Sequence, residues 1–229
     1  MLNTQKKVLV SDFDGVYVED SDALFKPNAW KALFSPWSDV HAALFKEGNE
    51  RFGNGNPGGR KEIIAYILKG LGVAPEAIPV EVDRLNSIFT TTVSNAIKEA
   101  GPVAGAHEML ETLKADGWIL YLNSGTATPA LREAAAILDI DSNFTKILGS
   151  TKEPHGGSKV ENLTHAMEHE GVEKSQMVMI GDGEPDRRAA EVFGCRFIGV
   201  ANRWNRWEPG LQPFPVARTL SEIPKLANQ

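Results

Sequence analysis

Val8-Leu9-Val10 is followed directly by Ser11-Asp12-Phe13-Asp14-Gly15. A short, continuous apolar run of this kind is typical of a strand that is covered on both faces. The two acids leave that strand together, and Gly15 permits a sharp turn. A carboxylate placed there can attack phosphorus, and a second carboxyl can give and take a proton. An acidic turn that only caps a helix would show the same pattern, so this stretch alone assigns no function.

Four more apolar runs predict strands, at 118–122, 147–148, 177–180 and 197–200. Between them, apolar residues recur at helical spacing near 105–115, 131–138 and 160–170. Strands that alternate with helices predict an α/β fold, a Rossmannoid, doubly wound parallel sheet. In such a sheet, ligands bind beyond the carboxyl ends of the strands.

Residues 20–100 interrupt this alternation. They contain no convincing strand, and Ile63, Ile64, Ile67, Leu68 and Leu71 form a helical stripe. The segment 75–100 reads as one long helix or as two. We therefore predict an all-helical insertion of about four helices, which divides the chain into a core, 1–19 with 101–229, and an inserted domain, 20–100.

Three further segments lie at or just past predicted strand ends. Asn123-Ser124-Gly125-Thr126 offers a small hydroxyl and turn amides, which can hold a phosphoryl oxygen. Lys159 precedes a predicted helix and could neutralise negative charge. Gly181-Asp182-Gly183-Glu184-Pro185-Asp186 carries two carboxylates on one tight loop, oxygen ligands of the kind that Mg²⁺ favours. A helix cap, a surface lysine and a capped turn would account for the three segments taken singly.

Taken together, these segments resemble the haloacid dehalogenase (HAD) superfamily. The stretches Val8–Val16, Ile119–Thr126, Lys159–Leu163 and Val178–Asp186 occur in the order of that family's motifs. The resemblance covers the chain outside the insertion. The insertion lies between the first two motifs, which resembles the helical C1 cap of the branch that includes phosphoglycolate phosphatase and beta-phosphoglucomutase.

The resemblance implies catalytic roles for Asp12, Asp14 and Lys159, and it implies that Ser124, Gly125 and Lys159 bind the substrate phosphate. Asp12 would be the nucleophile, and Asp14 would be the general acid and base. Ser124, with backbone amides near Gly125, would bind the phosphoryl oxygens. Lys159 would stabilise the charge of the transition state. An acid two positions after the nucleophile is typical of the family's phosphatases and phosphomutases, so Asp14 disfavours a dehalogenase.

The resemblance also implies a magnesium site. Asp182 and Asp186 would hold Mg²⁺, and Asp12 and the main-chain carbonyl of Asp14 would complete the site. The third motif leaves one alternative open. Lys152-Glu153-Pro154 competes with Lys159, because many relatives follow this lysine with proline, but Lys159 lies immediately before a helix and at the more typical distance from Asp182.

Substrate specificity in this family comes from cap loops. The loop between two predicted cap helices carries four candidates for contact with the non-reacting end of the substrate: Arg51, Asn54, Asn56 and Arg60. Arginine suits a carboxylate or a second phosphate. A flexible loop between helices would explain the same composition. Some relatives place a Schiff-base lysine in the cap, but nothing in the sequence marks Lys26, Lys31 or Lys46 for that role.

Composition excludes several other classes of protein. The 229 residues carry a net charge of −6, which argues against a nucleic-acid partner despite the Arg203-Trp204-Asn205-Arg206-Trp207 stretch. Cys195 is the single cysteine, so a disulfide scaffold is excluded. No apolar run approaches the length that spans a bilayer, and no signal peptide is visible. We expect a cytoplasmic protein, without a membrane partner, that is a monomer or a homodimer.

The sequence thus predicts an Mg²⁺-dependent phosphohydrolase that cleaves a phosphate monoester of a small metabolite through an aspartyl-phosphate. Two alternatives remain open. A phosphomutase would use the same nucleophile and cap but return the phosphoryl group to a sugar. A catalytically silent binding protein could use the same fold, although such a protein need not keep the four carboxylates.

Overall fold

The computed structural model describes residues 6–53, 59–150 and 158–229. Its centre is a six-stranded sheet with the order β3-β2-β1-β4-β5-β6, in which every neighbouring pair is parallel. The strands are β1 (Lys7–Ser11), β2 (Trp118–Ala127), β3 (Lys146–Ser150), β4 (Met177–Gly181), β5 (Arg196–Val200) and β6 (Val216–Ala217).

Helices cover both faces of the sheet because its strands are apolar on both sides. Leu9, Leu120 and Val178 join the buried cluster on one face, and Val8 and Met179 join the cluster on the other. The first cluster includes side chains of α5 (Ala106–Ala115), α6 (Thr128–Ile137) and α9 (Ile223–Ala227). The second includes side chains of α7 (Lys159–Glu170) and α8 (Glu184–Phe193). Short 3-10 turns lie at Asp141–Asn143, Lys174–Gln176 and Leu220–Glu222.

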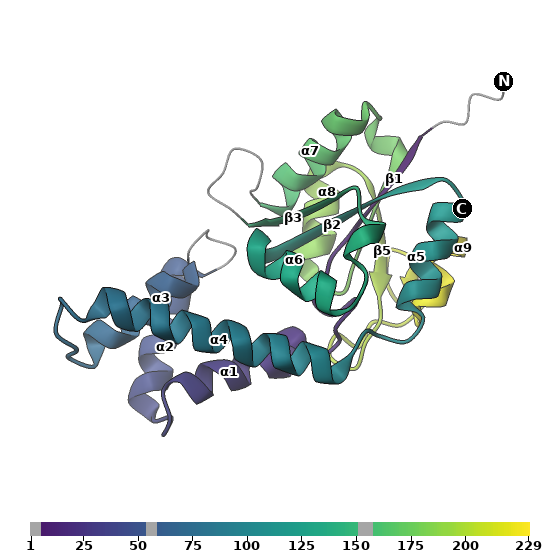
Figure 1. The fold of residues 1–229 in the computed structure, drawn as a ribbon. Coiled ribbons are helices and arrows are strands. Elements are labelled where there is room, and N and C mark those ends of the chain that lie inside the picture. Colours follow the sequence, from purple (N-terminus) through teal and green to yellow (C-terminus); the bar gives the residue numbers. More distant parts are fainter. Residues whose placement is uncertain (1–5, 54–58, 151–157) are drawn as a thin grey trace.

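The segment between β1 and α5 is helical in all its described elements. A π-helical turn, η1 (Ser21–Phe25), leads into α1 (Lys26–Leu33), α2 (Asp39–Phe52), α3 (Gly59–Gly70) and α4 (Ile78–Ala100). These four α-helices gather to one side of the sheet (Figure 1), around a buried cluster of their own that includes Ile64, Ile67 and Leu85.

The predicted α/β fold is confirmed, with a parallel sheet and a helical insertion. Each of the five predicted strands is present, and the segment 75–100 contains one long helix, α4, rather than two. The structure adds β6, an edge strand of two residues that is too short to give a periodic signal. No helix in the described part of the chain is both long and apolar enough to cross a membrane.

The strand order explains where the acidic segments meet. From β1 the chain moves to β2 and β3 on one side, and then crosses to β4, β5 and β6 on the other. The crevice at such a reversal, outside the carboxyl ends of the strands, is where open α/β sheets bind ligands. The segments after β1, β2 and β4 all open into this crevice, which is continuous with a cavity of about 1690 Å³ that reaches the helices of the insertion.

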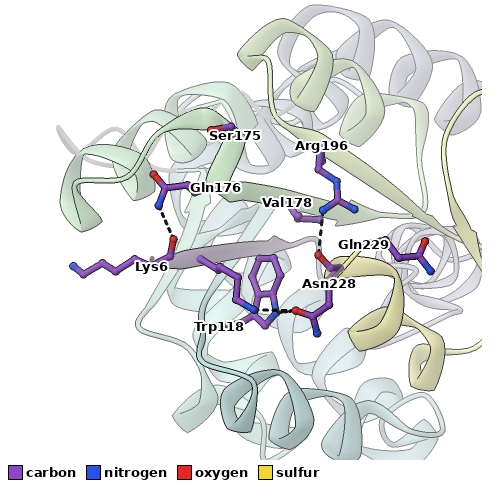
Figure 2. Close-up of a pocket in the computed structure, with 10 residues that line it drawn as sticks. Lys6, Trp118, Ser175, Gln176, Val178, Arg196, Asn228 and Gln229 are labelled. Carbon is purple, nitrogen blue, oxygen red and sulfur yellow. Dashed lines mark hydrogen bonds between the residues drawn. The ribbon is translucent and has the colours of Figure 1, made fainter. Parts of the chain in front are cut away.

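A second, smaller pocket lies at the opposite end of the sheet. Its volume is about 300 Å³, and it is lined by residues at the amino ends of β1, β2 and β5, including Lys6, Trp118 and Arg196, together with Asn228 (Figure 2). The Asn228 side chain accepts a hydrogen bond from Trp118 Nε1, at 3.2 Å. None of the predicted catalytic residues lines this pocket.

Candidate active site

Asp12 and Asp14 leave the carboxyl end of β1 and are both buried. The backbone N–H of Asp12 donates to Ile180 O at 2.9 Å, which continues the pairing of β1 with β4 beyond the strand. The turn that follows requires Gly15, whose φ is +76°. A Cβ on Gly15 would lie 2.0 Å from Asp182 Oδ2, so the missing side chain leaves the space that the Asp182 carboxylate occupies.

Three carboxylates converge at this point. Asp12, Asp182 and Asp186 each offer an oxygen, and these oxygens lie within 4.8 Å of one another. Burial, reinforced by the charge of Asp186, raises the pKa of Asp12 well above its ordinary value, although Lys159 opposes the shift. Burial also raises the pKa of Asp182 to about 6, with a smaller contribution from Asp186. Keeping all three acids ionised at once therefore costs free energy unless a cation lies beside them.

Two asparagines after β5 fix the Asp182 loop. Asn202 Nδ2 donates to Asp182 Oδ2 at 2.7 Å, and Asn205 Nδ2 donates to the main-chain oxygen of Asp182 at 2.9 Å. The sequence pattern assigns neither residue a role in the site. Their position does point to the site, because both follow a predicted strand at its carboxyl end, where open α/β sheets bind ligands.

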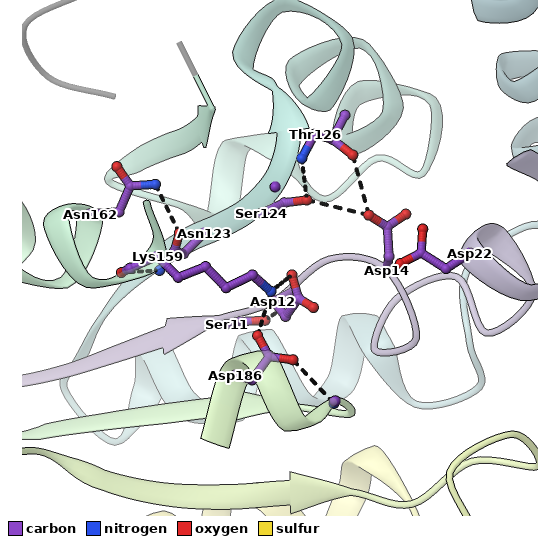
Figure 3. Close-up of polar contacts among 12 residues, drawn as sticks. Ser11, Asp12, Asp14, Asp22, Asn123, Ser124, Thr126, Lys159, Asn162 and Asp186 are labelled. Carbon is purple, nitrogen blue, oxygen red and sulfur yellow. Dashed lines mark hydrogen bonds and ion pairs between the residues drawn. The ribbon is translucent and has the colours of Figure 1, made fainter. Parts of the chain in front are cut away.

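Lys159 brings positive charge to the same acids (Figure 3). Its Nζ lies 2.9 Å from Asp12 Oδ1 and also donates to Asp186 Oδ1. Burial alone would lower the pKa of Lys159, but Asp12 and Asp186 raise it above its ordinary value, so this lysine stays charged. The ion pair places a cation beside the predicted nucleophile.

The position of Lys159 is set by the start of α7. Ser158 caps the helix by accepting from the backbone N–H of Glu161, and the Glu161 side chain accepts from the backbone N–H of Ser158 at 2.6 Å. Asn123, on β2, donates to the main-chain oxygen of Lys159 at 3.0 Å and accepts from Asn162 at 2.9 Å. These contacts tie the first turn of α7 to the end of β2.

Asp14 faces away from the acidic cluster, toward hydroxyl groups (Figure 3). Ser124 Oγ and Thr126 Oγ1 each donate to Asp14 Oδ2 at 3.3 Å, and Lys26 Nζ lies 2.8 Å from the same oxygen. Burial alone would raise the pKa of Asp14, but Lys26 lowers it below its ordinary value. The sequence did not mark Lys26 for any role.

Some of the remaining predicted residues line the cavity, and others do not. Gly125 lines the cavity and so does Arg60, whose NH1 donates to Thr90 Oγ1 at 3.0 Å. Arg51 stacks over the Tyr66 ring, at 5.2 Å from its centroid, and does not line the cavity. Three of the residues named from the sequence lie outside the described residues: Asn54, Asn56 and Lys152.

The acidic cluster fits a divalent metal ion by its chemistry. Carboxylate oxygens are the ligands that Mg²⁺ prefers, and it needs few protein ligands because it keeps several waters. Asp12 Oδ1 is buried and forms no hydrogen bond of ordinary geometry with a described residue, although Lys159 is near it. Asp12, Asp182 and Asp186 could therefore hold such an ion. The Asp14 carboxylate stands outside this group.

Comparisons with known proteins identify the family of this chain. The family model for haloacid dehalogenase-like hydrolases matches residues 6–194. A phosphoglycolate phosphatase of Haemophilus influenzae is 26% identical over 208 residues, which are 89% of each chain.

Two solved structures share the fold. A 2-haloacid dehalogenase of Pseudomonas syringae has a TM-score of 0.72 at 16% identity, over 98% of this chain and 99% of its own. A beta-phosphoglucomutase of Clostridium difficile has a TM-score of 0.65 at 17% identity, over 98% of each chain. The match to the family model spans well over half of the sequence. The chain therefore belongs to the haloacid dehalogenase-like hydrolases, and it is a hydrolytic enzyme whose curated relatives are phosphatases.

Proposed function

We propose that this protein is an Mg²⁺-dependent phosphohydrolase that cleaves the phosphate monoester of a small metabolite through an aspartyl-phosphate on Asp12. One observation carries the proposal. The carboxylates of Asp12, Asp182 and Asp186 converge within 4.8 Å, and Lys159 lies 2.9 Å from Asp12. A phosphate dianion approaches a carboxylate nucleophile only where positive charge offsets the repulsion.

The first half of the reaction forms the covalent intermediate. A carboxylate oxygen of Asp12 forms a bond to phosphorus as the bond from phosphorus to the ester oxygen breaks. Asp14 takes up a proton as the phosphate monoester binds, and it gives this proton to the departing oxygen. Ser124 and the amides near Gly125 hold the phosphoryl oxygens, while Lys159 stabilises their charge. Mg²⁺, held by Asp12, Asp182 and Asp186 and by the main-chain carbonyl of Asp14, would supply the remaining positive charge.

The second half restores the enzyme. Asp14, now a carboxylate, takes a proton from water as that water attacks phosphorus. The bond between phosphorus and Asp12 breaks, which frees inorganic phosphate and the Asp12 carboxylate. Asp14 has regained the proton that it gave to the leaving group, so the cycle closes.

We propose that residues 20–100 form a cap that selects the substrate, over a core of 1–19 and 101–229. Arg60 supports this assignment. It is half-buried on the wall of the cavity and lies 4.4 Å from the centroid of the Phe89 ring. None of its described contacts is with a carboxylate. A guanidinium of this kind suits a second anionic group on the substrate. Because the Haemophilus influenzae relative is a phosphoglycolate phosphatase, phosphoglycolate is the first compound to test.

The test is release of inorganic phosphate from a panel of phosphorylated metabolites that includes phosphoglycolate. Each compound is assayed with Mg²⁺, with EDTA, and with Asp12→Asn as the blank. We expect selective release that EDTA and Asp12→Asn both abolish. Absence of release from the whole panel would overturn the proposal and lead to an isomerisation assay with a bisphosphate activator, which detects a phosphomutase. Full activity of Asp12→Asn would contradict the mechanism.

A further inference from the structure

Lys26, at the first residue of α1, extends into the active site. Its Nζ lies 2.8 Å from Asp14 Oδ2 and 2.6 Å from Asp22 Oδ1, and it donates to Thr126 Oγ1 at 3.3 Å. The side chain keeps 26% of its exposure and lines the large cavity. The ammonium therefore has two acids and a hydroxyl around it, and one of the acids is the predicted general acid and base.

This contact crosses between two parts of the molecule. Lys26 belongs to the helical insertion, whereas Asp14 follows β1 and Thr126 lies near the end of β2. Among the described residues, it is the one ion pair that joins helices α1–α4 to the core segments 1–19 and 101–229, while Asp20, which precedes these helices, pairs with Arg203. The position of α1 and the orientation of the Asp14 carboxylate are thus linked through the side chain of Lys26.

An ordinary surface ion pair would explain only part of the arrangement. The pair of Lys26 with Asp22 is a common i,i+4 contact on an exposed carboxylate, and such pairs stabilise little. The pair with Asp14 differs because that carboxylate is buried. Three donors converge on Asp14 Oδ2, and the ammonium is both the closest and the only charged one. Charge-assisted contacts are the stronger kind, so Lys26 dominates the orientation of this carboxylate.

We infer that Lys26 is a positioning residue for Asp14, supplied by the helical insertion to hold the acid and base group in place for proton transfer. This inference rests on the proposed function. It assigns Lys26 an action through Asp14, rather than a direct contact with the phosphate. Removal of Lys26 should therefore harm the same step that removal of Asp14 harms.

A double-mutant cycle tests the inference in the full-length protein. Lys26→Met is measured alone and in the Asp14→Asn background, beside Lys26→Arg and the control Lys31→Met, an exposed lysine of the same helix. The substrates are p-nitrophenyl phosphate and the alkyl phosphate that the enzyme turns over best. Because nitrophenolate leaves without a proton, Asp14→Asn should keep a measurable first turnover on p-nitrophenyl phosphate, although hydrolysis of the intermediate, which also uses Asp14, is slowed.

We expect Lys26→Met to lower kcat on the alkyl phosphate about tenfold or more, a part of the roughly 10²–10⁴-fold that general acid–base catalysis contributes. It should lower the first-turnover rate of nitrophenolate release from p-nitrophenyl phosphate less, as Asp14→Asn does, and change KM little. In the Asp14→Asn background it should have almost no further effect, because both changes remove the same contribution. Lys26→Arg should restore part of the activity, and Lys31→Met should match the wild type.

Equal fold losses from Lys26→Met in both backgrounds would overturn the inference and indicate that Lys26 acts independently of Asp14. Unchanged kcat in Lys26→Met would overturn it as well. Both results leave the proposed function intact, because the wild type is active in each. A wild type that releases no phosphate from either substrate would instead overturn the proposed function, and this inference with it.

Discussion

Gly15 makes room for one carboxylate of the acidic cluster. Its φ of +76° is a conformation that L side chains rarely adopt, and its missing Cβ leaves room for the Asp182 carboxylate. Gly117 has a similar φ of +81°, but nothing lies within 4 Å of the position of a Cβ there. A substitution at either glycine strains the backbone, but only a substitution at Gly15 displaces a carboxylate. Comparing the two positions therefore distinguishes the two effects.

Gly15→Ala should abolish Mg²⁺-dependent phosphate release, because the new methyl group displaces Asp182. Gly117→Ala should keep its activity. Gly117→Ala should lose about 1–2 kcal/mol of unfolding free energy because it forces alanine into a left-handed conformation, and Gly15→Ala should lose at least as much. Urea denaturation measures the stability, and a phosphate assay measures the activity. Equal activity in the two variants would show that Asp182 does not need this space.

Arg60 should govern substrate affinity rather than chemistry. Its guanidinium lines the cavity with no carboxylate among its described contacts, so Arg60→Met should raise KM for a substrate with a second anionic group by about tenfold, the effect of one lost charged hydrogen bond. The value of kcat should change little. Arg84→Met, which removes an exposed arginine that pairs with Glu81, is the control. If KM stays constant in Arg60→Met, another residue recognises the distal group.

At the scale of elements, the first turn of α7 carries Lys159 into the site. Ser158→Ala removes the side-chain cap and should lower the unfolding free energy by about 1 kcal/mol. It should also reduce kcat, because fraying of this turn loosens the contact of Lys159 with Asp12. Ser175→Ala, at an exposed serine of a 3-10 turn, is the matched control for both measurements. A loss of stability without any loss of kcat would show that Lys159 is held by other contacts.

The strands and the acidic segments can be predicted from the sequence because the patterns that indicate them are local. Continuous apolar runs predicted β1, β2 and β4, and the acids that follow β1 and β4 were read from the rule for carboxyl ends. Lys26 could not be found in this way. Its contact with Asp14 depends on how α1 sits against the sheet, which no local pattern encodes. Asn202 lay within reach of the same rule, but asparagine alone suggested no chemistry.

For the molecule as a whole, the converging carboxylates predict that Mg²⁺ stabilises the folded state. An ion that binds the native state at about 100 times its Kd adds about 2.7 kcal/mol of stability. Mg²⁺ should therefore raise the Tm of the wild type, and EDTA should reverse the shift. Asp182→Asn should lose most of the shift, whereas Asp83→Asn, at an exposed acid of the insertion, should keep it. The same shift in all three proteins would place the ion elsewhere.

The arrangement of the molecule places the acidic cluster in a crevice that the inserted helices border. The reversal of strand order between β2 and β4 brings the ends of three strands to one crevice, and the inserted helices border the cavity above it. A site bordered in this way can exclude water from a reactive acyl phosphate until hydrolysis is due. Asp12, the proposed nucleophile, is buried where it lines this cavity, beside Lys159.

The most direct test of the central claim is to trap the intermediate. The enzyme is mixed with a turned-over phosphate monoester and Mg²⁺, quenched in acid during steady-state turnover, digested and analysed by mass spectrometry. We predict a phosphoryl group on Asp12, in the peptide that spans β1, and none in Asp12→Asn or in EDTA. Turnover with no phosphorylated protein, or with the phosphoryl group on another residue, would contradict the account.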